Sequence, residues 1–372
     1  MKVTIERAAL LKAMSRAQGV VERRNTIPIL ANVALEAEDA RLGLRATDLD
    51  IEITESLAAR IEGPGSTTVS AHLLHDILRK LPEGSEVSLA LDAANERLDI
   101  SAGRSNFQLP VLPRSDFPVM ASSEYDVTYR VPATRLRLLF DKSNFAVSTE
   151  ETRYYLNGVY LHVAEAHGEK RLRAVATDGH RLACIDTELP EGAEPAPGVI
   201  VPRKTVAELR KMLDDDGSEV ELSVSETKIR FRADGLTLTS KVIDGAFPDY
   251  TRVIPQANDK EMRVDAKAFG KAVDRVATVS QERSRTVKMT LSEDRLVLSV
   301  TAPDAGSATE ELDVAYGREP LEIGFNARYL SEIADQIDRE DAVFLFADPG
   351  APTLVREGEE SAAVYVVMPM RV

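Results

Sequence analysis

Three polar side chains of different chemistry lie close together in the 372-residue chain, at Asp178, His180 and Arg181. A carboxylate, an imidazole and a guanidinium at this spacing can act as acid, base and anion clamp in a hydrolase. No nucleophile at a recognisable spacing accompanies them, and the Asp and Gly residues of this run are typical of a turn. We therefore prefer a turn with a binding role and keep a hydrolase as the alternative interpretation.

Residue types that bind metals occur in two further segments. His72 and His75 lie one helical turn apart, but no further ligand motif accompanies them, so a solvated basic helix face is preferred. The acidic run from Asp214 to Glu219 lacks the alternate-residue spacing of a calcium loop. The single cysteine, Cys184, excludes a disulfide framework and argues against a cysteine-based zinc site. We predict no catalytic residue, no metal and no cofactor.

The overall charge of the chain argues against general affinity for nucleic acid. It contains 46 Lys and Arg residues against 61 Asp and Glu residues, a formal net charge of −15. Motifs typical of P-loop, dinucleotide-binding, α/β-hydrolase and zinc-protease sites are missing from the sequence. No apolar run is long enough for a secretion signal or a membrane span, so we expect a cytoplasmic protein without membrane contact. Any contact with DNA must come from local positive charge.

Positive charge recurs on one face of several predicted helices. A helical projection of residues 203–213 separates an apolar arc from a basic arc that contains Arg203, Lys204, Arg210 and Lys211. The same separation occurs at Lys12 and Arg16, at His72, His75, Arg79 and Lys80, and at Lys267, Lys271 and Arg275. Exposed helix faces are often rich in lysine. Four such faces in an acidic protein nevertheless favour a surface that contacts phosphates without reading bases.

A weak repeat divides the chain into three parts. Residues 1–5, 129–133 and 262–266 each predict a strand before a helix, and a second helix is expected at 72–81, 203–213 and 326–337. The turn sequences at residues 46–50 and 176–180 occupy matching places between strands. A period above one hundred residues is too long for a solenoid. We predict three tandem α+β domains, at residues 1–124, 125–256 and 257–372.

The last residues of the sequence are apolar where most C-terminal tails are polar. Residues 364–367 predict a final core strand, but Pro369 cannot continue a ladder of hydrogen bonds. The methionines on either side, Met368 and Met370, suit an adaptable binding surface. We expect this tail to line a peptide-binding groove, with completion of the third domain's core as the alternative.

Several segments together resemble one family, the bacterial sliding clamps, which are beta subunits of DNA polymerase III. The resemblance lies in residues 153–158, 174–183, 201–204, 247–250 and 365–371 and extends along nearly the whole chain. It implies the DNA clamp fold, with two βαβββ units in each of three similar domains. It also implies a head-to-tail homodimer that forms a six-domain ring, with helices lining the hole and sheets outside. The implied activity is that of a non-catalytic processivity factor that encircles double-stranded DNA.

The resemblance also implies three sets of site residues. For sequence-independent DNA binding, the family positions and the basic faces together are Arg24, Arg79, Lys80, Tyr154, Tyr155, Arg203, Lys204, Arg210, Lys211, Lys271 and Arg275. Glu150 and Glu151 stand where well-known relatives have neutral polar residues. At the dimer contact, Phe107 and Leu109 of one subunit would meet a helix near Thr278 and Val279 of the other.

The third set is a hydrophobic pocket for clamp-binding peptides. It comprises Leu156, Thr177, Gly179, His180, Arg181, Leu182, Pro248, Arg252, Val253, Asn326, Tyr329, Val366, Met368, Pro369, Met370 and Arg371. The partners that the resemblance implies are the catalytic subunit of the replicative DNA polymerase, the clamp loader, other polymerases, ligase and mismatch repair proteins.

Overall fold

The computed structural model describes residues 1–121, 124–166, 168–213, 217–280, 286–303 and 305–372. Along the chain, a strand, a helix and three or four further strands follow one another in the same order six times. This confirms the expected pair of βαβββ units in each third of the sequence. The helices are α1 (Arg7–Val20), α2 (Ala71–Lys80), α3 (Ala133–Asn144), α4 (Arg203–Met212), α5 (Ala266–Ala277) and α6 (Ala327–Ala334).

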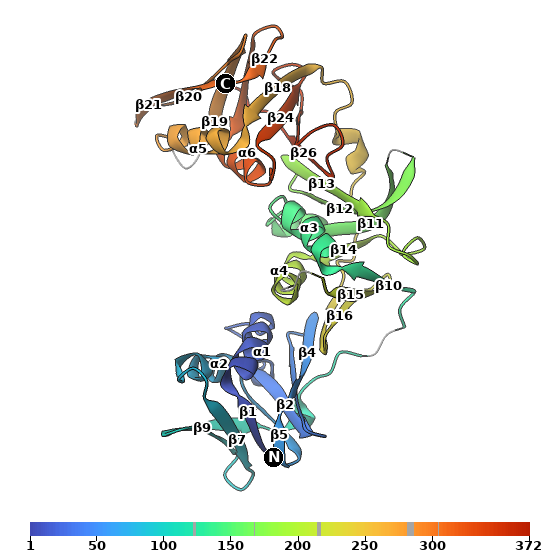
Figure 1. Cartoon of the computed structure of the whole chain (residues 1–372), viewed down its shortest axis with the longest axis vertical. Helices are drawn as coiled ribbons and strands as arrows, with labels where there is room; N and C mark the ends of the chain where they lie inside the picture. Colours follow the sequence, from blue (N-terminus) through green and yellow to red (C-terminus); the bar gives the residue numbers. More distant parts are fainter. Residues whose placement is uncertain (122–123, 167, 214–216, 281–285, 304) are drawn as a thin grey trace. The chain divides into compact units, whose positions relative to one another are not determined.

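The strands fall into three consecutive groups (Figure 1). The first contains β1 (Lys2–Glu6), β2 (Asn32–Glu38), β3 (Arg41–Thr47), β4 (Ile51–Ala58), β5 (Arg60–Gly63), β6 (Gly65–Ser70), β7 (Glu86–Asp92), β8 (Arg97–Ala102) and β9 (Ser105–Leu112). The second contains β10 (Val127–Pro132), β11 (Gly158–Ala166), β12 (Glu169–Thr177), β13 (Arg181–Glu188), β14 (Val199–Pro202), β15 (Glu219–Val224), β16 (Lys228–Ala233) and β17 (Leu236–Lys241). The third contains β18 (Lys260–Asp265), β19 (Thr286–Ser292), β20 (Arg295–Ala302), β21 (Gly306–Asp313), β22 (Ala315–Tyr316), β23 (Leu321–Asn326), β24 (Asp341–Phe346), β25 (Thr353–Arg356) and β26 (Ala363–Val367).

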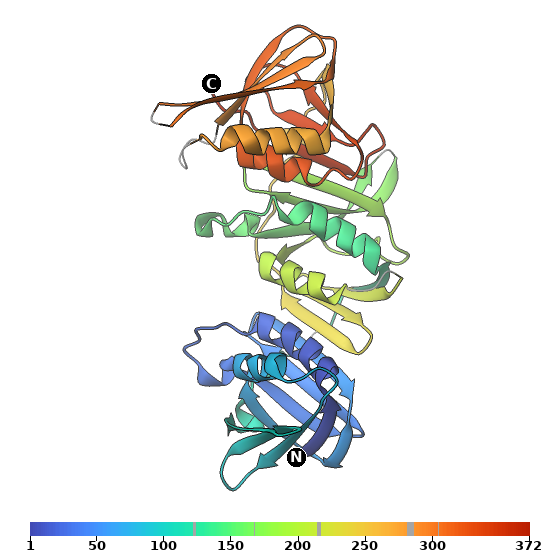
Figure 2. The same cartoon turned by 60° about the vertical axis from the view of Figure 1, so that its left-hand side comes forward.

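The chain divides into two compact units. The first consists of Met1–Arg137 and Pro190–Ile243. Apart from β14, its strands form one sheet in the order β10-β15-β16-β17-β4-β3-β2-β6-β9-β8-β7-β1-β5, so the sheet continues from the first repeat into the second through the antiparallel pair β17 and β4. Helices α1 and α2 lie side by side, and α4 also contacts α1 (Figure 2).

The second unit consists of Leu138–Leu189 and Asp244–Val372. Here the sheet order β11-β12-β13-β26-β25-β24-β18-β22 again joins two repeats, through the antiparallel pair β13 and β26. A separate sheet has the order β21-β20-β19-β23, and α5 and α6 lie side by side (Figure 2). Because pairing continues between repeats, the predicted domain limits at 124/125 and 256/257 fall inside the compact units.

Helices α2, α5 and α6 each begin after a residue whose side chain accepts a hydrogen bond from the first turn. In α5 the side chain of Asp265 accepts a hydrogen bond from the backbone N–H of Ala268 at 2.6 Å. Phe269 and Val273 are buried on the inner face, while Lys267 on the outer face is exposed. The predicted apolar arc of this helix is therefore confirmed.

The expected solvated basic face of α2 is wrong at its histidines. His72 Nδ1 lies 3.1 Å from Gln18 Oε1 and Nε2 lies 3.1 Å from the Val21 carbonyl oxygen, so this ring joins α2 to α1. The His75 side chain is only 12% exposed, and burial lowers its pKa. In α1 the expected exposure of Arg16 is also wrong, because Arg16 is buried and pairs with Glu55 at 2.9 Å. The reason is that packing partners cover polar as well as apolar faces of these helices.

Candidate peptide site, DNA-facing residues and dimer contact

A tight turn at residues 177–181 links β12 to β13. Thr177 Oγ1 donates to the Arg181 carbonyl oxygen at 2.7 Å and accepts from the Gly179 N–H at 3.0 Å. The Asp178 carboxylate accepts from the N–H groups of His180 and Arg181 at 2.9 and 3.0 Å. Gly179 has φ +88°, which glycine adopts without the steric cost of a side chain. The predicted turn is confirmed, and it presents His180 to solvent.

Arg181 lies beneath this turn instead of on its surface, with 6% of the residue exposed. Its Nε donates to Asp178 at 3.1 Å, its Nη2 donates to the Phe145 carbonyl oxygen at 2.6 Å, and its Nη1 pairs with Glu332 on α6. The guanidinium also lies 4.3 Å from the centre of the Tyr329 ring. Asp178 and Arg181 therefore hold the turn together, which leaves neither side chain available for hydrolysis.

The residues after β26 lie beside the turn. The Met368 N–H donates to the His180 carbonyl oxygen, and the Met370 N–H donates to the Gly324 carbonyl oxygen, both at 2.8 Å. A side chain at Gly324 would collide with Val372 and with the Met370 backbone, so a glycine is needed for the tail to approach β23. The tail is thus held by ordered backbone hydrogen bonds even though Pro369 ends the ladder.

We call the set His180, Val253, Tyr329, Met368 and Met370 the tail surface, in which Tyr329 is half-buried and the other four residues are exposed. Val253, Met368 and Met370 are 46%, 38% and 39% exposed, which is unusual for large apolar side chains. The His180 and Tyr329 rings stack with centroids 6.5 Å apart.

The other residues of the predicted pocket divide by burial. Leu156, Leu182 and Val366 are buried, whereas Gly179, Pro248, Arg252 and Arg371 are exposed, and Thr177, Asn326 and Pro369 are half-buried. Leu182 and Val366 form a core cluster with Val175, Cys184 and Tyr250. Asn326 caps α6, because its side chain accepts from the Arg328 N–H at 2.9 Å. The predicted pocket thus contains exposed, half-buried and buried residues, and of these Leu182 and Val366 pack in one cluster.

Among the predicted DNA contacts, Lys204 has acidic partners of its own. Its ammonium group lies 2.5 Å from Glu22, 2.6 Å from Asp48 and 2.8 Å from the Val20 carbonyl oxygen. Burial opposes its charge, but the hydrogen bonds to Asp48 and Glu22 outweigh burial and raise the pKa of Lys204. The expectation that Lys204 faces solvent with the rest of the basic arc is wrong. This side chain instead joins α4 to the end of α1 and to the turn after β3.

The remaining predicted DNA contacts of this unit are on the surface. Arg24, Arg79, Lys80, Arg203, Arg210 and Lys211 are exposed. Lys211 pairs with Glu208 one turn earlier at 2.7 Å, and Arg79 lies 3.8 Å from Asp76. The Arg79–Asp76 pair is exposed and exchanges partners at little cost, whereas Lys211, itself exposed, pairs with the buried carboxylate of Glu208. These residues therefore remain candidates for phosphate contact.

The second unit contributes Tyr154, Tyr155, Lys271 and Arg275. Tyr154 is 55% exposed, and its ring meets the Tyr155 ring edge-on with centroids 5.8 Å apart. Lys271 is exposed, whereas Arg275 pairs with Glu310 on β21.

The negative charge of Glu150, which stands close in sequence to Tyr154 and Tyr155, is paired with a neighbouring cation. Arg153 binds the Glu150 carboxylate through two nitrogens, at 2.7 and 2.9 Å. The hydrogen bond to Arg153 lowers the pKa of Glu150. Glu151 is exposed. Only one of the two acidic side chains is therefore paired with a cation beside the tyrosines.

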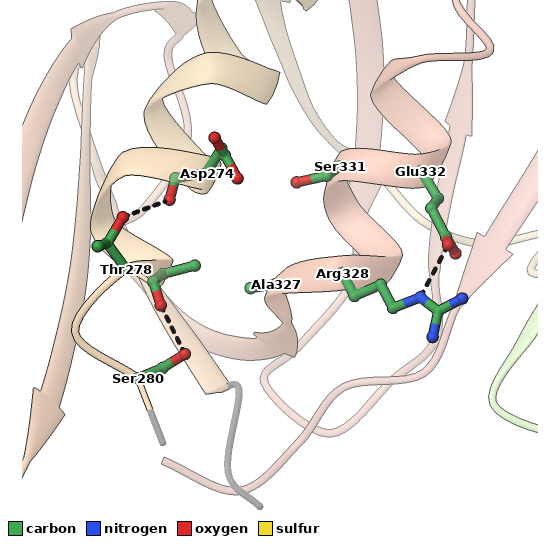
Figure 3. A pocket seen from close by; sticks show the side chains of 8 residues that line it. Asp274, Thr278, Ser280, Ala327, Arg328, Ser331 and Glu332 are labelled. Carbon is green, nitrogen blue, oxygen red and sulfur yellow. Dashed lines mark hydrogen bonds and ion pairs between the residues drawn. The ribbon is translucent and has the colours of Figure 1, made fainter. Parts of the chain in front are cut away.

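The predicted dimer residues differ in exposure. Phe107 on β9 is 37% exposed, but Leu109 is 6% exposed and packs within its own unit. In the second unit a cleft of about 360 Å³ lies between α5 and α6, and Thr278 is on its wall. Figure 3 shows Asp274 and Thr278 on one side of this cleft and Arg328, Ser331 and Glu332 on the other. Val279 is half-buried next to Thr278. Phe107 and Thr278 are therefore exposed, whereas Leu109 is buried and Val279 is half-buried.

The first unit contains a second copy of the turn, at residues 47–51. Thr47 Oγ1 donates to the Ile51 carbonyl oxygen at 2.8 Å and accepts from the Leu49 N–H at 3.0 Å. Asp48 accepts from the N–H groups of Asp50 and Ile51 at 2.9 and 2.8 Å. Sequence reasoning matched the two turns but missed the ion pairs around each, since their partners lie more than one hundred residues away in the chain.

Comparison with known proteins decides the family. The models of the N-terminal, central and C-terminal domains of the DNA polymerase III beta subunit match residues 1–121, 130–249 and 251–371. The chain belongs to the DNA polymerase III beta subunit family. Members of this family are sliding clamps, non-catalytic processivity subunits that act in DNA replication. The resemblance inferred from the sequence is confirmed, and the hydrolase alternative is not supported.

Individual members of the family match along their whole length. The chain is 55% identical over 372 residues to the beta sliding clamp of Caulobacter vibrioides and 37% identical over 372 residues to that of Escherichia coli, with all of each chain covered. The crystal structure of a sliding clamp from Bartonella birtlesii bound to griselimycin matches with a TM-score of 0.96 and 48% identity, and all of both chains is covered. A Caulobacter crescentus sliding clamp matches with a TM-score of 0.93 and 55% identity, again with full coverage of both chains.

The expectation of an α+β clamp fold with three tandem similar domains is thereby confirmed. In the part of the chain that the structure describes, no three His, Cys, Asp or Glu side chains gather as a metal site. Residues 214–216 of the acidic run lie outside the described residues. None of the helices with described residues is long and apolar enough to cross a membrane.

Proposed function

We propose that two copies of the chain associate head-to-tail into a ring that encircles duplex DNA and tethers partner proteins through the tail surface. Each copy would contribute three domains, at residues 1–124, 125–256 and 257–372. A closed ring cannot leave the duplex sideways, so weak phosphate contacts allow sliding while bound partners stay at high local concentration. The observation that carries the proposal is the tail surface, because it exposes large apolar side chains in a protein with a net charge of −15.

The proposed ring closes between Phe107 of one copy and the cleft near Thr278 of the other. A head-to-tail contact requires two different surfaces, here the exposed Phe107 ring and the cleft of about 360 Å³. Phe107→Asp should give monomers, because a buried carboxylate without a partner is strongly unfavourable. A substitution at Leu109 would be a poor test, since Leu109 is buried and its loss could prevent folding as well as dimerisation. A Phe107→Asp protein that sediments as a dimer at low concentration would contradict this contact.

The proposed DNA contact is electrostatic and independent of sequence. The positive charge comes from seven exposed side chains, those of Arg24, Arg79, Lys80, Arg203, Arg210, Lys211 and Lys271. Tyr154 and Tyr155 are the uncharged residues that we also expect to contact DNA. Retention on circular DNA with loss after linearisation tests for an encircling ring. Equal retention on both forms would indicate ordinary binding instead.

The proposed peptide site is the tail surface together with its floor of Leu156, Leu182 and Val366. Extended peptides bind such sites through a few apolar anchors, so loss of one wall removes much of the binding energy. We expect the site to serve the replicative polymerase, the clamp loader, other polymerases, ligase and mismatch repair proteins in the cytoplasm. Relatives from Bartonella birtlesii and Pseudomonas aeruginosa have been solved with griselimycin bound, so this compound is a suitable competitor.

The test compares two exposed apolar side chains, one in the tail and one at the turn of the first unit. Met368→Ser should reduce the affinity for a labelled clamp-binding peptide of the polymerase at least tenfold, whereas Leu49→Ser at the other turn should leave it unchanged. Deletion of residues 368–372 should abolish binding while the protein stays folded, since it removes two backbone hydrogen bonds worth about 1 kcal/mol each. A large loss of melting temperature on deletion would instead favour a purely structural tail. Normal peptide affinity in the folded Met368→Ser protein would refute the site.

A further inference from the structure

We propose that Arg173 and His162 are positioning residues of the peptide site, acting through the hydroxyl group of Tyr250. This inference rests on the proposed function, because it concerns the wall of the site that residues 247–253 provide. None of the three side chains belongs to the set of residues expected to contact the peptide. Their role would be to hold Pro248 and Val253 in place.

Tyr250 connects the wall to the floor of the site. It begins a short 3₁₀ helix, Tyr250–Val253, in the segment between β17 and β18. The residue is 6% exposed and packs in one cluster with Leu182 and Val366 of the floor. Two residues before it Pro248 is exposed, and three residues after it Val253 is 46% exposed. The position of this single buried ring therefore decides where both exposed side chains lie.

The Tyr250 hydroxyl group has two buried or half-buried polar partners. Arg173 Nη1 donates to the hydroxyl oxygen at 3.2 Å, and His162 Nε2 lies 3.0 Å from it. His162 Nδ1 lies 3.0 Å from the Val163 carbonyl oxygen, which can only accept, so Nδ1 carries the proton of the neutral ring. Nε2 must then accept the hydrogen bond that the Tyr250 hydroxyl donates. The donor and acceptor of each hydrogen bond are thus fixed, because Arg173 donates to the Tyr250 hydroxyl oxygen and the hydroxyl donates to His162.

Both partners are themselves fixed. Arg173 on β12 binds Asp186 on β13 through two hydrogen bonds of 2.6 Å each. His162 on β11 stacks on Tyr160 with ring centroids 4.4 Å apart, and Tyr160 stacks on Phe247 at 4.9 Å. Phe247 belongs to the same segment as Tyr250. The sheet therefore holds the segment at two points, by stacking at Phe247 and by hydrogen bonds at Tyr250.

The remainder of the segment is held less firmly. Asp249 and Arg252 pair with each other at 2.8 Å, and both side chains are more than half exposed. Exposed pairs contribute little to rigidity. Loss of the Tyr250 hydroxyl bonds would therefore leave Val253 free to shift, while Met368 stays fixed by its own bond to His180.

The experiment is a titration of the full-length protein with a labelled clamp-binding peptide of the polymerase. Tyr250→Phe keeps the ring and removes the hydroxyl, and we expect an affinity loss of about five- to tenfold, as for one or two buried hydrogen bonds. His162→Gln retains a side-chain oxygen that can accept, so it should bind nearly normally, whereas His162→Leu should match Tyr250→Phe. Tyr316→Phe is the matched control, because Tyr316 is a buried tyrosine of the same unit whose hydroxyl donates to the Glu319 carbonyl oxygen at 2.6 Å.

A double-mutant cycle separates positioning from general loss of stability. The effects of Tyr250→Phe and Val253→Ala should be less than additive, because the first acts through the second, whereas Tyr250→Phe and Met368→Ala should add. In spectra of methyl groups, Tyr250→Phe should shift the Val253 signals and leave the Met368 signal in place. Unchanged peptide affinity in Tyr250→Phe, or equal additivity in both cycles, would overturn the inference while leaving the peptide site intact. Failure of the unmodified protein to bind the peptide would overturn the proposed site and this inference together.

Discussion

The turns at residues 47–51 and 177–181 have the same hydrogen bonds but different surroundings. In the first, Leu49 adopts φ +80° with its side chain 44% exposed, whereas Gly179 takes the equivalent place in the second with φ +88°. At each turn a residue at or just after the end of the neighbouring strand, β17 or β26, makes the same backbone hydrogen bond to the turn. The Lys241 N–H donates to the Asp50 carbonyl oxygen at 2.8 Å, as the Met368 N–H does to that of His180.

The ion pairs that close the two turns are arranged differently. At the first turn Lys204 reaches from α4 to Asp48, and Lys241 pairs with Asp50 at 2.8 Å, so cations cover the turn from outside. At the second turn Arg181 lies underneath and pairs with Asp178 and Glu332, which leaves His180 uncovered beside Met368 and Met370. The same hydrogen-bonded turn thus lies at the junction of successive repeats in both units. The side chains around it decide whether the junction is covered by ion pairs or open to a partner.

The largest expected effect is at Arg181, whose equivalent at the first turn is the buried Ile51. Arg181→Met should cost about 3–5 kcal/mol, because it leaves Glu332 and Asp178 without their buried cation. Ile51→Val should cost only about 1 kcal/mol. Hydrogen exchange in β13 and β4 during urea unfolding measures the two. Equal costs would mean that the second junction does not depend on its buried cation.

An exchange of residues between the turns should have the next largest effect. Gly179→Leu should cost about 1–2 kcal/mol, since a side chain is unfavourable at positive φ. Its Cβ would also lie 2.5 Å from Arg153 Nη1 and displace this group. The reciprocal Leu49→Gly should change stability by less than about 1 kcal/mol. Peptide titration should show weaker binding only for Gly179→Leu, and normal binding by that variant would show that the glycine is not needed at the site.

Two neighbouring cations of α4 should have smaller effects, one on stability and the other on DNA binding. Lys204→Met should lower stability by about 1 kcal/mol or less, because its ion pairs are partly exposed, and should change DNA binding little. Arg203→Met should leave stability unchanged and reduce the salt dependence of DNA binding by about one phosphate contact. Thermal unfolding and a salt titration of DNA retention measure both. A larger loss of salt dependence for Lys204→Met than for Arg203→Met would restore Lys204 as a DNA contact.

Acidification should have the smallest effect, and in the second unit it should act through His162. Burial lowers the pKa of His162 below its usual value of 6.5, so the unfolded chain binds the proton more readily. The stability contributed by the neutral ring is complete above that value and is lost as pH falls below it. His162→Gln should therefore flatten the decline of stability of the second unit between pH 7.5 and 5.5, and an unchanged pH profile would argue against this assignment.

The family, the repeated order of elements, the turns and the final strand follow from the sequence, because each depends on residues close together in the chain. Apolar spacing marks the inner face of α5, and Thr, Asp and Gly at residues 177–179 specify a turn from local hydrogen bonds. The end of the final strand is also local information, since Pro369 lacks the N–H group that would continue the hydrogen bonds of any sheet.

What lies opposite each polar side chain was decided only by the tertiary structure. A helical projection assigns Lys204, Arg16 and His72 to a polar face, but it cannot show that Asp48, Glu55 and Gln18 meet them there. Arg181 is buried because Glu332 approaches from α6, about 150 residues away along the chain, at a place set by the pairing of β13 with β26. The burial and charge of a polar group depend on partners that folding brings from distant parts of the chain, and the local sequence does not indicate which residues these partners are.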